Sequence, residues 1–106
     1  MTKTVRSQVA LAVVLSLAGA VSFAQSAGEA TYTAKCKMCH GATGVPNAAM
    51  GKAMGIKAVT DPEIKKLTVA EMITAVKDGK GKMKPIAGLT DDQIKESVMY
   101  YRSLGK

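Results

Sequence analysis

The sequence predicts an all-α protein built from three main helices and one short helix. No segment shows the strict alternation of apolar and polar residues that marks a half-buried strand. Four segments match the capping box, in which a hydroxyl side chain accepts from a first-turn N–H and a Glu or Gln three residues later reaches back. These segments are Ser26–Glu29, Thr60–Glu63, Thr68–Glu71 and Thr90–Gln93.

The helices expected from these starts cover residues 27–36, 61–66, 69–78 and 91–104. Pro62 supports the second of them, because a proline at a first helical position gives up an N–H that would have no partner there. Gly79 and Gly105 follow the third and fourth helices at the position where a helix-ending glycine belongs.

The first and last predicted helices each carry one stripe of apolar or small residues. Gly28, Tyr32 and Cys36 recur at i, i+4 and i+8. A glycine inside a helix costs about 1 kcal/mol relative to alanine, so we expect Gly28 to have a packing reason. On the last helix the matching stripe is Ile94, Val98 and Tyr101, flanked by Tyr100 and Leu104.

Residues 1–24 have the pattern of a cleaved signal peptide, ahead of one domain over residues 25–106. Lys3 and Arg6 precede an apolar run over residues 9–21, and Ser22-Phe23-Ala24 is a small-x-small cleavage site. The run is shorter than the roughly 20 residues that span a bilayer. We therefore expect a periplasmic protein with no stable membrane insertion, and an uncleaved anchor is the alternative.

Cleavage after Ala24 would leave 82 of the 106 residues, with the net charge falling from +7 to +5 as Lys3 and Arg6 are lost. The only Phe, Phe23, would also be removed, which leaves three Tyr as the aromatic residues. A chain this short buries only ~60–65% of its unfolded surface. Two cysteines form at most one disulfide, so we expect a bound group to complete the thin core.

The sequence Cys36-Lys37-Met38-Cys39-His40 identifies that group. A redox dithiol is expected near a βαβ pattern, which is absent, and a zinc site needs four N or S ligands, whereas His40 is the only His and there is no third Cys. In c-type attachment the two thiols add to the porphyrin vinyl groups as thioethers, and the adjacent imidazole binds iron. We predict one covalent haem c held by Cys36 and Cys39, with His40 on the iron.

The ligand on the other face of the iron is open to several candidates. With one His in the chain, two histidines cannot both ligate the iron. Met83 stands apart from the helical methionines, because Gly79 and Gly81 precede it and Lys84-Pro85 follow it, which predicts an irregular loop that can approach a porphyrin closely. The rivals are Met50 and Met54, spaced i, i+4, and a position with no methionine ligand.

On these residues the chain resembles the class I c-type cytochromes, which are small soluble electron carriers. The resemblance runs from Gly28 and Tyr32 through the Cys-x-x-Cys-His motif and residues 79–83 to residues 94–104. It implies the cytochrome c fold around one haem, with His40 and Met83 as axial ligands and a close crossing of the first and last helices at Gly28. It also implies that a proline carbonyl accepts from the His40 ring, and Pro46 is the candidate.

The resemblance implies a one-electron carrier, and we do not expect an enzyme because no Ser, His or paired carboxylates are arranged for catalysis. One departure from the family pattern is Lys84, which separates Met83 from Pro85. The alternatives are a haem-based sensor or small-ligand binder with an open or labile distal position, and a dithiol oxidoreductase without haem.

Lysines crowd the predicted haem site. A positive ring there would attract a redox partner with an acidic docking surface, although the same lysines could serve solubility alone. We expect a monomer that binds no nucleic acid, because the charge is not interleaved with aromatic residues. The lysines are Lys35, Lys37, Lys80, Lys82 and Lys84, with Lys52 and Lys57 between them in the sequence.

Overall fold

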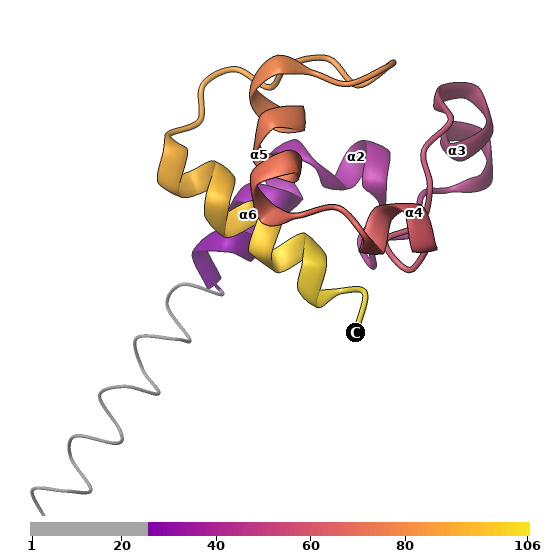
Figure 1. The fold of residues 1–106 in the computed structure, drawn as a ribbon, viewed down its shortest axis with the longest axis horizontal. Helices are drawn as coiled ribbons and strands as arrows, with labels where there is room; N and C mark the ends of the chain where they lie inside the picture. Colours follow the sequence, from indigo (N-terminus) through magenta and orange to yellow (C-terminus); the bar gives the residue numbers. More distant parts are fainter. Residues whose placement is uncertain (1–25) are drawn as a thin grey trace, which may run out of the picture.

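The computed structural model describes residues 26–106 (Figure 1). Within them the only extended pairing is an isolated bridge between Lys80 and Met83, so the predicted all-α fold is confirmed. The first helix covers residues 26–35, and the others are α2 (Lys37–His40), α3 (Ala48–Met54), α4 (Pro62–Lys65), α5 (Val69–Asp78) and α6 (Asp91–Ser103).

The signal peptide predicted for residues 1–24 lies outside the described residues. None of the described helices has the length and apolar character needed to cross a bilayer.

Two of the predicted capping boxes are confirmed and one is wrong. Thr68 starts α5 and Thr90 starts α6, each with both reciprocal hydrogen bonds. At α4 the cap is Asp61, whose side chain accepts from the Glu63 N–H at 2.9 Å. Asp61 stands directly before Pro62, which fixes the first helical residue, and the Glu63 carboxylate pairs with Lys57. The box at Ser26 stays a prediction.

The two predicted helix-ending glycines behave differently. Gly79 ends α5 with a φ of 83°, and its N–H donates to the Ala75 carbonyl, as expected. Gly105 directly follows Leu104, the C-cap of α6, as expected, but it does not take the positive φ that Gly79 takes. The last turn tightens instead, and the Gly105 N–H donates to the Arg102 carbonyl at 3.1 Å.

Helix α3 was not among the predicted elements. It begins at Asn47, whose side chain accepts from the Met50 N–H at 2.8 Å, and ends at Gly55 with a left-handed φ of 68°. Both are standard capping residues, so the signal was present in the sequence. A second difference is a break at Cys36, which separates α2 from the first helix.

The first helix crosses α6 closely at Gly28, as the resemblance implied. A Cβ atom on Gly28 would collide with the Glu96 carbonyl oxygen and lie 3.2 Å from the Tyr100 Cβ. Next to this crossing, Tyr32 is only 2% exposed, and its ring centroid lies 5.4 Å from that of Tyr100. Gly28 therefore has the packing reason that its position inside a helix required.

The core lies between α5 and α6, which pack against each other. Its buried cluster is small, and the loop after α5 covers it with partly buried side chains that include Met83 and Ile86. The buried members are Met72, Val76, Ile94 and Val98. Three of these four also line the large cavity described below, so the core is open on one side.

Candidate cofactor-binding site

One side of the core opens into a cavity of about 830 Å³. Ligand pockets in proteins typically measure ~300–1,000 Å³. The cavity is lined by the Cys-x-x-Cys-His segment, by α5 and α6, by the chain just after α3 and by the loop that carries Met83. The predicted site residues Cys36, Cys39, His40 and Met83 all lie on its wall.

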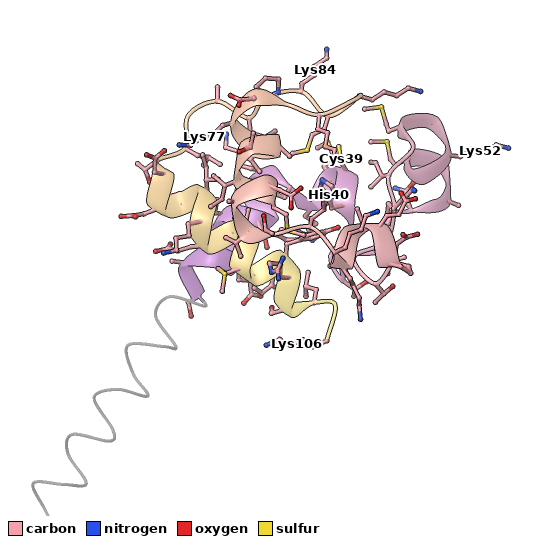
Figure 2. All side chains as sticks on the ribbon, in the orientation of Figure 1. Cys39, His40, Lys52, Lys77, Lys84 and Lys106 are labelled. Atoms are coloured by element: carbon pink, nitrogen blue, oxygen red, sulfur yellow. The ribbon has the colours of Figure 1, made fainter. Side chains whose placement is uncertain are left out.

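Helix α2 presents the motif to the cavity as a single turn. The His40 N–H donates to the Cys36 carbonyl at 3.0 Å, and both cysteines are half-buried with free thiols. Met38, between them, is 85% exposed and faces away from the cavity. Burial, reinforced by the neighbouring Cys39, raises the pKa of the Cys36 thiol. The turn therefore places two thiols and one imidazole on the cavity wall and leaves Met38 in solvent. Figure 2 labels Cys39 and His40 on this turn.

His40 is held neutral by its surroundings but lacks the acceptor that was expected. Burial lowers its pKa, which favours the uncharged ring that binds metals. Its Nδ1 is buried with no hydrogen-bond partner, so the expected bond to the Pro46 carbonyl does not form. The turn at Gly41, with a φ of 84°, brings the Val45 carbonyl against Gly41 instead.

Two tyrosines contact the Cys-x-x-Cys-His turn and the residue that follows it. The Tyr32 hydroxyl donates to the Gly41 carbonyl at 2.6 Å, and burial raises the pKa of Tyr32 well above its usual value. Tyr101 meets the His40 ring edge-on, with centroids 5.4 Å apart, and stacks on Tyr32 at 6.0 Å. Sequence analysis placed Tyr32 and Tyr101 on the helix faces, but their contacts with Gly41 and His40 carried no local signal.

Met83 sits at the end of a tight turn, in the irregular loop that the sequence predicted. Lys80 and Met83 exchange both backbone hydrogen bonds at 2.9 Å, and Gly81 takes a left-handed φ of 59°. At Gly79 a Cβ atom would lie 2.8 Å from the Met83 carbonyl oxygen and 2.9 Å from the Pro85 Cδ. The Ile86 N–H then donates to the Val76 carbonyl, which returns the chain to α5.

The other methionines divide clearly by position. Met54 and the 8%-exposed Met72 also line the cavity, but the Met72 sulfur lies 3.8 Å from an Arg102 nitrogen that donates to it. Met50 is not on the cavity wall, and Met99 is 51% exposed. Among the described residues, Met54 is therefore the remaining rival to Met83.

The residues on the cavity wall fit the haem that the motif predicted. One turn offers two free thiols and a neutral imidazole with a buried, unpartnered nitrogen. A thioether stands on a separate loop, and the walls between them are mostly apolar, as a porphyrin requires. In residues 26–106 no three His, Cys, Asp or Glu side chains are grouped to hold a metal ion by themselves.

Comparisons with known proteins agree with this geometry. The family model described as cytochrome c oxidase, cbb3-type, subunit III matches residues 23–100. Cytochrome c-555 of Chlorobaculum thiosulfatiphilum is 40% identical over 83 residues, which are 71% of this chain and 90% of that protein. The solved structure of the KustC0563 c-type cytochrome is similar with a TM-score of 0.66 and 29% identity, covering 74% of this chain and 98% of that one.

Fold, cavity and motif together define a haem-binding electron-transfer protein. The chain belongs to the c-type cytochrome family, as the family match over residues 23–100 and the 40% identity to cytochrome c-555 show. It therefore carries covalently bound haem c and exchanges electrons with redox partners.

Replacing Tyr32 by Phe tests the hydroxyl that holds the motif. Tyr32→Phe keeps the ring packing but removes the donor to the Gly41 carbonyl, so we expect a loss of about 1–3 kcal/mol in the free energy of unfolding. Denaturant unfolding of the haem-loaded protein measures it. Tyr100→Phe is the matched control, because no hydrogen bond of the Tyr100 hydroxyl is present in residues 26–106. Equal stabilities of the two variants would contradict the role of Tyr32.

Proposed function

We propose that this cytochrome is a periplasmic one-electron carrier whose haem is bonded to Cys36 and Cys39 and ligated by His40 and Met83. The observation that carries the proposal is that Met83 lines the same cavity as the Cys-x-x-Cys-His turn. His40 and Met83 are 43 residues apart in the sequence. The hydrogen-bonded turn of residues 80–83 supports this, because a ligand on a pinned loop changes position little between oxidation states.

The haem supplies a one-electron ferric/ferrous couple when bound. A neutral thioether from Met83 would favour the ferrous state and raise the reduction potential relative to a second histidine. Burial lowers the pKa of His40, which favours the uncharged ring that binds metals, and the mostly apolar walls limit the approach of water. If His40 and Met83 both bind the iron, small molecules would have no free site on it, which favours a carrier over an enzyme.

Replacing Met83 by Ala tests the axial ligand. We expect Met83→Ala to abolish the weak red absorption of a ferric Met–haem bond and to lower the reduction potential, because the thioether is lost. Optical spectra and a redox titration measure the two effects. Met54→Ala tests the rival on the cavity wall, and Met99→Ala is the exposed control.

A Met83→Ala spectrum identical to that of the unchanged protein would reassign the ligand, to Met54 if Met54→Ala loses the band. The alternative function, a sensor or small-ligand binder, predicts prompt and tight binding of carbon monoxide to the unchanged ferrous protein at neutral pH. A carrier with Met83 held on the iron predicts slow, weak binding under the same conditions.

We also infer that the chain is exported and processed at Ala24. The support is the sequence of residues 1–24, with Lys3 and Arg6 ahead of a short apolar run and a small-x-small site at Ser22-Phe23-Ala24. Intact mass spectrometry of the secreted protein is expected to give a chain beginning at Gln25 plus one haem. The haem should remain on the proteolytic peptide that contains Cys36 and Cys39. A mass that includes residues 1–24 would favour the membrane anchor.

Exposed lysines at the cavity rim support docking of an acidic redox partner. Lys35 and Lys80 line the cavity and are exposed, whereas Lys37 and Lys52, which the sequence grouped with them, do not line it. Lys57 is paired with Glu63, which offsets its charge. The unpaired lysines on the rim therefore concentrate positive charge where an electron would enter or leave. They are Lys35, Lys66, Lys80, Lys82 and Lys84 among the described residues, none of which has an ion pair there.

Reversing two of these charges tests the docking proposal. Oxidation of the ferrous protein by ferricyanide, an anionic probe, should slow about tenfold at low salt in Lys80→Glu/Lys84→Glu, and the difference should disappear at high salt. The control Lys95→Glu/Lys106→Glu has the same net charge but places it away from the cavity, as Figure 2 shows for Lys84 and Lys106. Equal slowing in both pairs would mean that net charge, and not the rim, attracts the probe.

A further inference from the structure

One hydrogen bond joins the Met83 loop to α3. The Lys82 Nζ donates to the Ala53 carbonyl at 3.0 Å, across 29 residues of sequence. Ala53 lies in the last turn of α3, where carbonyl groups lack a partner within the helix and carry the negative end of its dipole. A lysine ammonium is a favourable partner for such a group, so Lys82 acts as a cap supplied from another part of the chain.

The two ends of this bond belong to opposite parts of the cavity rim. Met54, Gly55 and Ile56 follow Ala53 directly and line the cavity, as do Lys82 and Met83. In Figure 1 the loop after α5 extends from the top of that helix toward α3. The Lys82–Ala53 hydrogen bond therefore joins two segments that both line the cavity, the methionine loop and the end of α3.

Helix α3 has little else to fasten it. None of its residues is buried, and among helices α2 to α6 only α5 and α6 make extensive contact with each other. Segments with few buried contacts open locally at low free-energy cost. Within residues 26–106, the Lys82–Ala53 bond is the one hydrogen bond that joins α3 to a distant part of the chain.

The three lysines of the Met83 loop are consequently not equivalent. Lys82 is tied to a backbone carbonyl, whereas Lys80 and Lys84 have no side-chain hydrogen bond or ion pair within the described part of the chain. The alternation of Lys80, Lys82 and Lys84 in the sequence suggested one role for all three. The contacts assign a different role to the middle one.

We propose that Lys82 is a positioning residue that fastens the Met83 loop to α3 and thereby sets how readily Met83 leaves the haem iron. The proposal rests on Met83 being the axial ligand, as inferred above. A small molecule can bind the iron on that face only after the loop moves outward, and this movement must break the Lys82–Ala53 hydrogen bond or carry α3 along.

Imidazole binding to the ferric haem-loaded protein tests this role. In Lys82→Ala, binding is expected to be about two- to tenfold faster, the range given by a net hydrogen-bond contribution of about 0.5–1.5 kcal/mol. Lys82→Arg keeps a cationic donor and should restore the slow rate. Lys52→Ala is the matched control, because it removes one charge from α3 at an exposed side chain that points away from the cavity (Figure 2).

Hydrogen exchange supplies a readout that does not depend on the iron. The amides of Gly55 and Ile56, which both donate to Gly51, and of Met83, which donates to Lys80, should exchange faster in Lys82→Ala than in Lys52→Ala. Faster hydrogen exchange in both α3 and the loop would support the proposal, because the Lys82 side chain contacts both segments.

Three results would overturn the proposal. Unchanged hydrogen exchange in Lys82→Ala would mean that the Lys82–Ala53 bond does not hold the loop to α3. Equal imidazole binding rates in Lys82→Ala and Lys52→Ala would mean that the loss of one positive charge, and not of this bond, changes the rate. Faster exchange with an unchanged imidazole rate would show that the fastening does not control Met83. Failure of Met83 ligation itself is distinguished separately, because the Met83→Ala spectrum would then match that of the unchanged protein.

Discussion

The fold depends on an apolar cavity that its own side chains do not fill. Val76 and Val98 belong both to the buried α5–α6 cluster and to the cavity wall, so the core is complete only when a large apolar group lies against it. Anything that binds the folded state and not the unfolded one stabilises the fold, and a covalent haem remains in place at every protein concentration. Haem binding and the stability of the fold are therefore coupled in this short chain.

The motif turn is positioned by contacts that start at the opposite end of the domain. Gly28 lets the first helix touch α6, and this close approach brings Tyr32 against the tyrosines of α6. From there the Tyr32 hydroxyl reaches the Gly41 carbonyl, and Tyr101 meets the His40 ring. A small residue at the helix crossing thus determines where the imidazole stands, although it lies 12 residues from His40 in the sequence.

Local signals in the sequence were sufficient for part of this structure. The capping boxes at Thr68 and Thr90 and the glycine at 79 each act through neighbours within a few residues, and the structure has all three. At α4 two local caps competed, and Asp61 prevailed because Pro62 fixed the helix start. The expected His40–Pro46 bond and the unexpected Lys82–Ala53 bond both depend on how separate loops fold back, for which no short pattern exists.

The three lysines of the Met83 loop have two different roles: Lys82 holds the loop to α3, and Lys80 and Lys84 add positive charge at the cavity. The Lys82 ammonium donates to a carbonyl at the C-terminus of α3, so the negative end of the helix dipole offsets part of its charge. Lys80 and Lys84 stay exposed on the rim and contribute their full charge to the field around the cavity. A change in partner charge or ionic strength would act on Lys80 and Lys84, whereas the hold on Met83 depends on a short-range bond that salt screens less. If Met83 ligates the iron as proposed, substitutions at Lys80 and Lys84 would change the attraction of a partner without changing the contact that holds the Met83 loop to α3.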